Sequence, residues 1–574
     1  MDTLRKIFTY SKKYRKNLAA ATIFAVIGVV CSLLVPILTG KAIDCIVGKD
    51  NVDFGKTAVI LGILAASVVT GGISQWIMAR HTNTLSYLTT RDIRIDFFNK
   101  LNKVPISYID RNSKGDFVSR ATNDIETVSD ALTQGFTQFF TGVITIAGTL
   151  AFMFVIDFRI ALIVIVLTPL SLAAAALITK FSHKAFTRQS HIRGELSGFS
   201  DEMIKNHSII EAFCYQQTAE ERFESLNSEF GEAGLKATFL SSISNPTTRF
   251  VNGMIYALVA LTGALRAVSG NISVGTLVSF LSYANQYTKP FNEISGVVTE
   301  LQNAIACAER VFKVIAAENE SDDSTLPELS APDGSVAFDN IDFSYVPEKP
   351  LLQDINISVK PGQRVAIVGP TGCGKTTLIN LLMRFYDTTD GNIIISGQNI
   401  KEIKRDSLRE CFGMVLQETW LFKGTIADNI SYGKPDATEE EITEAAKAAY
   451  AHSFIKRLPD GYKTIISENG GNLSQGQKQL LTIARIMLTN PPMLILDEAT
   501  SNIDIRTEVK IQQAFEKLMK GKTSFIIAHR LSTIRNTDLI LVMKDGNIIE
   551  HGNHNELMKK NGFYSTLYMS ASAV

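Results

Sequence analysis

The stretch Gly369-Pro370-Thr371-Gly372-Cys373-Gly374-Lys375-Thr376 decides the fold of the second half of this 574-residue chain. It fits the pattern G-x-x-x-x-G-K-[ST], in which glycines let backbone N–H groups surround phosphate groups. Apolar runs precede it at residues 364–368 and follow it at residues 378–382. We therefore predict a strand, a phosphate-binding turn and a helix whose N-terminal dipole favours an anion.

Two side chains of this loop have predicted roles. We expect Lys375 to reach the terminal phosphates of a nucleotide and the Thr376 hydroxyl to hold Mg²⁺. The pattern alone is only moderately specific, because background residue usage produces it in roughly two random chains of this length per hundred. Its position between a predicted strand and a predicted helix makes a chance match much rarer.

Acidic and imidazole side chains follow two further apolar runs. Asp497 and Glu498 directly follow residues 492–496, and His529 directly follows residues 524–528. Beside a phosphate loop, Asp497 is placed to hold magnesium through water and Glu498 to polarise the attacking water. We expect His529 to contact the γ-phosphate. The alternatives are a solvated acidic turn and a structural histidine.

The first 300 residues have the hydropathy of a membrane domain. The chain is 45% hydrophobic with a mean hydropathy of +0.11, an average that suits a membrane half joined to a soluble half. A helix crosses the hydrocarbon core with about 20 apolar residues. Six stretches have about that length: 18–40, 57–79, 136–156, 160–179, 250–268 and 274–296. Buried core helices are the alternative, but residues 18–40 contain no charge. We expect a strict hydropathy cut to miss the fifth and sixth stretches.

Basic residues predict the orientation of these spans. Cytosolic ends of membrane proteins are enriched in Lys and Arg. Six such residues precede the first span: Arg5, Lys6, Lys12, Lys13, Arg15 and Lys16. We expect a cytosolic N-terminus, six crossings and a cytosolic C-terminus in the cell membrane. The long inner links, 80–135 and 180–249, are rich in charge at helical spacing and are predicted to be cytosolic helices.

Polar groups of the sixth span have two interpretations. Gln286, Lys289 and Glu293 line a polar cavity, or they lie on a cytosolic extension of the helix. Residues 316–334 are polar and lack periodicity, which predicts a linker between a membrane domain (1–315) and an α/β domain (335–574). The net charge of zero gives no indication of a nucleic-acid partner, and the six scattered cysteines indicate reduced thiols.

In this order and spacing the motifs resemble an ATP-binding-cassette (ABC) exporter half-transporter of the bacterial multidrug type, along essentially the whole chain. Leu473-Ser474-Gln475-Gly476-Gln477 is similar to the family signature LSGGQ. Residues 108–116 and 120–124 resemble the first cytosolic loop of exporters, and residues 210–214 with 220–223 resemble the second. The resemblance implies that Gln417 senses magnesium and water, Tyr345 stacks on adenine and Asp504 lies between two sites.

The resemblance also implies an architecture. An all-α membrane domain of six helices, domain-swapped in a dimer, precedes an α/β P-loop domain. Mg²⁺ and ATP lie between two such domains, with the signature contributed by the opposite copy. The implied catalytic residues are Glu498, His529 and Gln417, and the implied metal ligands are Thr376, Gln417 and Asp497. The implied nucleotide contacts are Tyr345, Gly369, Pro370, Thr371, Gly372, Cys373, Gly374, Lys375, Thr376, Thr377, Ser474, Gln475, Gly476, Gln477 and Asp504.

One residue departs from the family pattern. Gln475 stands where glycine is usual in the signature, close to the expected phosphates. We therefore expect a heterodimer, in which Gln475 faces a weakened site of a second half-transporter. A tolerated substitution is the alternative.

The expected function is ATP-driven export of hydrophobic or amphipathic compounds across the lipid bilayer. Lipid or peptide export is an alternative within the class. An ATP-gated channel is less favoured because Glu498 is intact, and a soluble ATPase is disfavoured by the apolar stretch 18–40.

Overall fold

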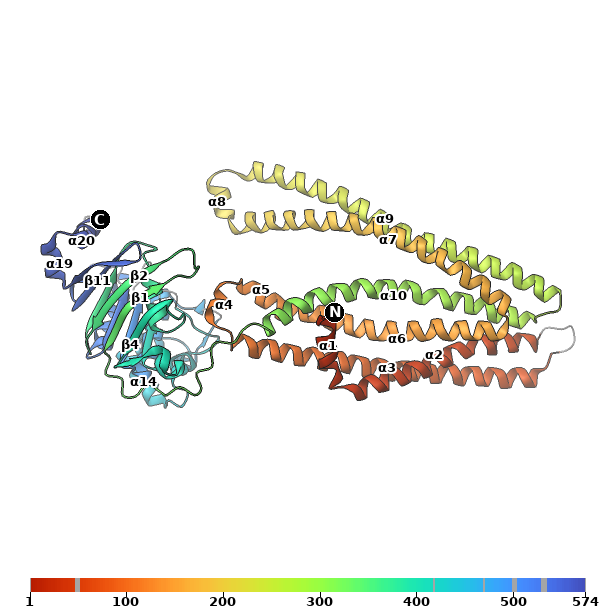
Figure 1. Ribbon diagram of the computed structural model, residues 1–574, viewed down its shortest axis with the longest axis horizontal. Coiled ribbons are helices and arrows are strands. Elements are labelled where there is room, and N and C mark those ends of the chain that lie inside the picture. The colour runs from red at the N-terminus through yellow and green to blue at the C-terminus, as the bar shows by residue number, and fades with distance from the viewer. Residues whose placement is uncertain are drawn as a thin grey trace. The chain divides into compact units, whose positions relative to one another are not determined.

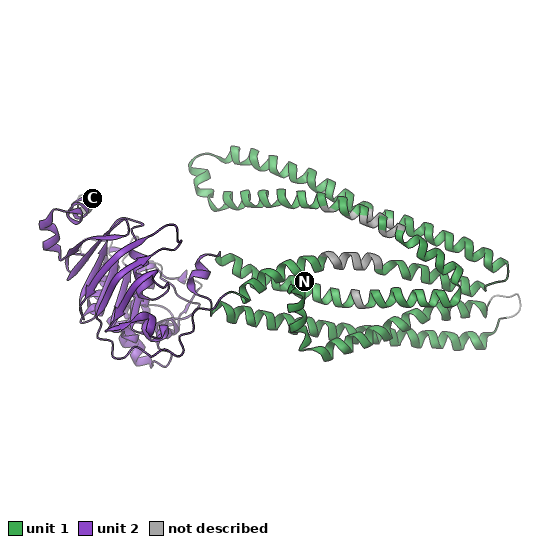
Figure 2. Cartoon of the chain, in the orientation of Figure 1, with its two compact units in different colours: residues 1–103, 113–317 green, residues 104–112, 318–574 purple. Residues whose placement is uncertain are grey.

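The computed structural model describes residues 2–46, 52–416, 419–467, 470–497, 503–527 and 534–572. The chain forms two compact units (Figure 2). The first comprises Met1–Lys103 and Ser113–Ala317, and the second comprises Val104–Asn112 and Glu318–Val574. Of the predicted linker 316–334, residues 318–334 therefore belong to the second unit, and residues 316 and 317 belong to the first.

The first unit is helical (Figure 1). Its elements are α1 (Asp2–Lys12), α2 (Arg15–Asp44), α3 (Phe54–Leu101), α5 (Lys114–Ser119), the π-helical turn η1 (Arg120–Asp124), α6 (Ile125–Ile156), α7 (Phe158–Lys205), α8 (His207–Ala212), α9 (Gln216–Val268) and α10 (Val274–Ile315). The longest, α9, has 53 residues and α3 and α7 have 48 each, more than twice the roughly 20 that a bilayer core needs. The predicted helical inner links are thus continuations of the membrane helices.

All six predicted apolar stretches lie inside helices of this unit. Among the described residues, four helical segments are long and apolar enough to cross a membrane: Arg15–Asp44, Phe54–Leu101, Lys114–Ile156 and Arg249–Val268. The fifth stretch therefore passes the criterion that we expected it to fail. Within the part of the chain that the structure describes, the fourth stretch is represented by the shorter Phe158–Pro169, and no segment of α10 passes.

Helices α2 and α10 approach closely because small residues face each other. A Cβ atom on Gly275 would lie 1.9 Å from the Gly40 carbonyl oxygen, so a methyl group has no room there. The Asp44 carboxylate accepts bonds from the Gly275 N–H (2.7 Å) and the Ser273 hydroxyl (2.6 Å). This contact caps the first turn of α10 with a carboxylate, which the helix dipole favours.

The second unit contains three sheets. The antiparallel sheet has the order β2-β1-β4-β5, the larger sheet β12-β11-β3-β10-β9-β6, and the smallest β7-β8. The strands are β1 (Val336–Phe343), β2 (Leu352–Val359), β3 (Arg364–Val368), β4 (Asp390–Ile395), β5 (Gln398–Asn399), β6 (Phe412–Val415), β7 (Gly424–Thr425), β8 (Ile465–Ile466), β9 (Met493–Asp497), β10 (Thr523–Ile527), β11 (Leu539–Lys544) and β12 (Asn547–Gly552).

Helices accompany these sheets in the second unit. They are α4 (Ile106–Asp110), α11 (Lys375–Leu382), α12 (Arg405–Glu410), α13 (Ile426–Ile430), α14 (Glu439–Ala448), α15 (His452–Ile455), α16 (Gln475–Thr489), α17 (Ile505–Met519), α19 (His554–Lys560) and α20 (Phe563–Ser572), with 3₁₀ turns η2 (Ile400–Glu402), η3 (Ser431–Gly433) and η4 (Gly461–Lys463). The unit is thus the α/β domain that the sequence predicts.

The large sheet brings the predicted site residues to one edge. Strands β6, β9, β10 and β3 run parallel, and Ile527 pairs with both Ile367 and Asp497. Their side chains are almost entirely buried, as expected for parallel strands covered on both faces. Because parallel strands end at the same edge, the phosphate loop after β3 and the end of β9 lie at one edge with β10 between them. Ligands of open α/β sheets bind at this edge.

The contact between α2 and α10 predicts a difference between two glycines. Gly275→Ala should lower the melting temperature of the detergent-purified protein by several degrees, because overpacking costs about 1–3 kcal/mol. Gly62→Ala on α3 is the control, since a Cβ there meets nothing within 4 Å. Equal melting temperatures for the two variants would contradict the packing described.

Candidate nucleotide-binding site

The phosphate loop joins β3 to α11 through a backbone that requires glycine. Gly369, Gly372 and Gly374 have φ angles of +155°, +83° and +101°. A Cβ atom on Gly369 would lie 2.2 Å from the Met543 carbonyl oxygen, whereas one on Gly372 would meet nothing within 4 Å. The loop is thus braced on one side and open at Gly372, so it can admit a ligand next to the N-terminus of α11.

Lys375 lies folded back over this loop. Its ammonium group donates hydrogen bonds to the carbonyl oxygens of Gly369 (2.8 Å) and Pro370 (2.9 Å), and the residue is only 9% exposed. A buried ammonium needs such partners. A phosphate close to the loop can offer stronger, charge-assisted bonds, so Lys375 is held near the place where we expect it to act. Thr376, the next residue, is exposed.

The predicted catalytic residues follow, in the sequence, three strands of the large sheet. Asp497 is the last residue of β9 and is half-buried. Glu498, His529 and Gln417 lie outside the described residues, and the chain reaches them shortly after β9, β10 and β6. Their roles stay predictions. The residues described fit ATP with Mg²⁺, because the loop offers N–H groups and an ammonium to phosphates and Asp497 offers an oxygen ligand.

Tyr345 lies in a cluster of aromatic rings beside α11. The rings of Phe343 and Tyr386 pack edge-on against it, each with centroids 4.9 Å from the Tyr345 centroid. Its hydroxyl lies 3.3 Å from the Thr377 hydroxyl oxygen. The ring is 36% exposed, so one part of it is accessible to a planar base. Adenine stacking on Tyr345 suits this geometry.

Sequence reasoning missed the partners of this cluster. The Tyr386 hydroxyl donates a 2.6 Å hydrogen bond to Asp110 at the end of α4, and Arg111 donates to the Tyr345 carbonyl oxygen (3.4 Å). Burial and then the Asp110 carboxylate raise the pKa of Tyr386 far above its usual range, so the phenol stays protonated. The resemblance predicts a cytosolic loop at residues 108–116, but no local pattern of the sequence links this loop to Tyr345.

The signature residues form the N-terminus of α16. The Ser474 hydroxyl accepts a bond from the Gln477 N–H (3.3 Å), while the Gln477 side chain accepts one from the Ser474 N–H (2.9 Å). This reciprocal capping box gives Ser474 and Gln477 a structural role at the start of α16. A Cβ on Gly476 would lie 2.4 Å from the Thr507 side chain, so glycine is required there.

Gln475 and Asp504 lie on the exposed surface near these residues. The Gln475 amide lies 3.4 Å from the Thr419 hydroxyl oxygen, so the side chain lies along its own domain. Asp504 caps α17 by accepting the Thr507 N–H (2.9 Å), and this bond lowers the pKa of its carboxyl group. Asp504 is therefore ionised at neutral pH and has a capping role in addition to its predicted place between sites.

Together, the helical unit and the phosphate loop define a membrane-embedded P-loop ATPase. Residues 18–291 match the ABC transporter transmembrane region, and residues 352–501 match the ABC transporter domain. The chain belongs to the ABC transporter family. It is an exporter with an ATP-hydrolysing domain coupled to transport.

Three comparisons describe its relatives. The chain is 42% identical over 519 residues to a fatty acid ABC transporter ATP-binding/permease protein of Mycobacterium tuberculosis, covering 90% of this chain and 82% of that protein. It is 34% identical over 576 residues to a putative multidrug export ATP-binding/permease protein of Bacillus subtilis, covering 99% of each. A bacterial Atm1-family ABC exporter with ATP bound matches with a TM-score of 0.80 and 27% identity, covering 97% of this chain and 98% of that one.

The burial of Cys373 in the phosphate loop predicts its reactivity. Cys373 is 4% exposed, whereas Cys214 between α8 and α9 is exposed. A bulky maleimide should label Cys214 at least about tenfold faster than Cys373, because reaction requires access to the thiolate. ATP should slow labelling of Cys373 further and leave Cys214 unaffected. Mass spectrometry of peptides measures both rates, and ATP-insensitive labelling of Cys373 would contradict the assignment of the loop.

Proposed function

We propose that the protein uses ATP to export hydrophobic or amphipathic compounds across the cytoplasmic membrane by alternating access. The observation that carries this proposal is the glycine-dependent phosphate loop with its held Lys375, in the same chain as helices long enough to span a bilayer. The basic N-terminal segment supports a cytosolic position for both termini.

The residues of the site have distinct proposed roles. Lys375 and the loop N–H groups bind the phosphates, and Tyr345 stacks on the adenine. Thr376, Asp497 and Gln417 would hold Mg²⁺, which offsets the charge that develops on the phosphates. Glu498 takes a proton from the attacking water, and His529 contacts the γ-phosphate. Ser474 and the α16 N-terminus bind the same nucleotide from the opposite copy.

ABC exporters work as dimers in the lipid bilayer. The comparisons do not support the heterodimer that Gln475 led us to expect, and the fusion of both domains in one chain favours two identical copies. The position of Gln475 along its own surface, next to Thr419, is compatible with a tolerated substitution. We propose a homodimer.

A fatty acid is a second candidate substrate. The relative from M. tuberculosis is named as a fatty acid transporter. In this chain, Lys180 and Arg249 are exposed at the predicted cytosolic ends of the fourth and fifth spans, beside the exposed rings of Phe181 and Phe250. Cationic groups next to apolar rings suit a carboxylate with an acyl chain, although such residues also anchor helices at the membrane interface.

The role of Glu498 gives the first test. Glu498→Gln should leave ATP binding intact and reduce hydrolysis by roughly 10²–10⁴-fold, because the amide cannot accept the proton of water. Binding is measured with a fluorescent nucleotide and turnover by phosphate release from the protein in lipid nanodiscs. Turnover within about tenfold of the original would rule out Glu498 as the general base.

The substrate class is tested with inverted vesicles. A fluorescent long-chain fatty acid and a hydrophobic cationic dye are offered with ATP, and Glu498→Gln vesicles serve as the control. We expect ATP-dependent accumulation of at least one probe. Accumulation of the fatty acid alone would favour the second candidate, and accumulation of neither would contradict export of amphipathic compounds.

A further inference from the structure

The predicted linker is bound to the second unit through a buried arginine. Arg405, the first residue of α12, is only 5% exposed. Its guanidinium group donates to the Ser321 carbonyl oxygen (2.9 Å), the Ser321 hydroxyl (2.6 Å) and the Asp323 carboxylate (3.3 Å). The same Asp323 oxygen accepts the Arg405 main-chain N–H (2.7 Å). We call Arg405, Ser321 and Asp323 the arginine clasp.

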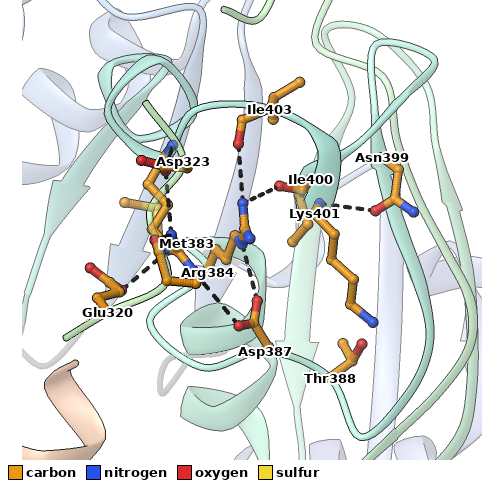
Figure 3. Close-up of polar contacts among 12 residues, drawn as sticks. Glu320, Asp323, Met383, Arg384, Asp387, Thr388, Asn399, Ile400, Lys401 and Ile403 are labelled. Carbon is orange, nitrogen blue, oxygen red and sulfur yellow. Dashed lines mark hydrogen bonds and ion pairs between the residues drawn. The ribbon is translucent and has the colours of Figure 1, made fainter. Parts of the chain in front are cut away.

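Further charges surround the clasp. Glu320 lies 3.3 Å from the Arg405 Nε atom, close enough for an ion pair but not aligned for a hydrogen bond. Glu320 also pairs with Arg409 (3.6 Å), and Asp387 lies 3.8 Å from the Arg405 Nη2 atom. Figure 3 shows Glu320, Asp323 and Asp387 in this cluster. These carboxylates thus compensate the charge of the buried guanidinium group. Without them, the burial of that charge would be costly.

Backbone hydrogen bonds extend the attachment beyond Asp323. The Lys404 N–H donates to the Pro327 carbonyl oxygen (2.9 Å), and the Leu329 N–H donates to the Ser407 hydroxyl oxygen (2.8 Å). Leu329 is 8% exposed. Residues 320–329 are therefore fastened along α12, although their sequence has the polar, aperiodic character of a linker.

The clasp lies between two segments of the nucleotide site. Helix α12 leads along the chain into β6, which ends shortly before Gln417 in the sequence. Arg384 and Asp387 follow α11, the helix of the phosphate loop. The Arg384 guanidinium donates to Asp387 (3.0 Å) and to the carbonyl oxygens of Ile400 (2.8 Å) and Ile403 (3.1 Å), as Figure 3 shows. Displacement of either segment by a nucleotide would therefore move the clasp.

We propose that Arg405 is a positioning residue of the transport cycle, because the arginine clasp shortens the connection between α10 and the nucleotide domain to residues 316–319. A flexible polar linker would absorb a displacement of the domain through its own conformational freedom. A short connection passes the displacement to the end of α10. The mechanical role in transport rests on the proposed function. The existence of the clasp does not depend on that function.

A protease measures the clasp without any need for transport. In the full-length protein in nanodiscs, a Glu-specific protease should cut after Glu320 and Glu328 at least about tenfold faster in Arg405→Gln. In that variant the segment opens without first having to break the buried contacts of Arg405, so the open form is more populated. Arg405→Lys should be intermediate, since an ammonium cannot make the forked contacts. Lys404→Gln is the control: it removes only the exposed pair with Glu328, and the Lys404 N–H bond stays. Equal rates in Arg405→Gln and the original protein would overturn the clasp.

Two insertions test the mechanical role and keep every residue of the clasp. Gly-Ser-Gly-Ser after Ala317 lies on the α10 side of the clasp and lengthens the connection. The same insertion after Ser330 lies beyond the clasp and should have no mechanical effect. Because neither touches Arg405, failure to fold after its substitution does not affect this comparison.

The readout is the ATP-induced change in the distance between spin labels at position 271 of the two copies, in a cysteine-free Glu498→Gln background. The insertion after Ala317 should reduce that change by roughly half or more with unaltered ATP affinity, and the insertion after Ser330 should not. Equal changes in both insertions would overturn the mechanical role. If the parent protein shows no ATP-induced change, the proposed function fails, and the protease rates alone decide whether the clasp exists.

Discussion

The nucleotide site depends on one constraint, the parallel pairing of β3, β10 and β9, which ends three strands at a common edge. The phosphate loop can lie there only because three glycines adopt left-handed backbone conformations that side chains disfavour. Lys375 donates hydrogen bonds to two loop carbonyl oxygens, whose dipoles stabilise its charge and hold the ammonium group at the loop. The sheet thus fixes where the loop lies, and the loop provides the N–H groups and the ammonium group that bind a phosphate.

The chain passes between the two units at three places, after Lys103, Asn112 and Ala317. The first two enclose α4, whose Asp110 bonds to Tyr386 in the aromatic cluster of Tyr345. The third leads directly to the arginine clasp on α12. Each passage is therefore tied to residues that contact α11 or the residues that follow it, and α11 is the helix that begins at the phosphate loop. An ABC exporter needs such ties if ATP binding is to act on its membrane helices.

Local patterns predicted the strand–loop–helix around Lys375 and the helical nature of all six apolar stretches, because both depend on neighbouring residues. They could not reveal the contact between Tyr386 and Asp110 or that between Arg405 and Ser321, since these pairs are 276 and 84 residues apart. The lack of periodicity in residues 316–334 predicts a linker, but hydrogen bonds to a buried arginine require no periodicity. Glu498, His529 and Gln417 lie outside the described residues and stay predictions.

The most direct test of the central claim is ATP binding by the protein in lipid nanodiscs with and without the Lys375 ammonium. A fluorescent ATP analogue is titrated with Mg²⁺ into the original protein and into Lys375→Met. The account predicts that the original protein binds it and that the variant binds at least about tenfold more weakly, because charge-assisted bonds to phosphate contribute about 1.5–3 kcal/mol. Equal affinity in the two proteins would contradict it.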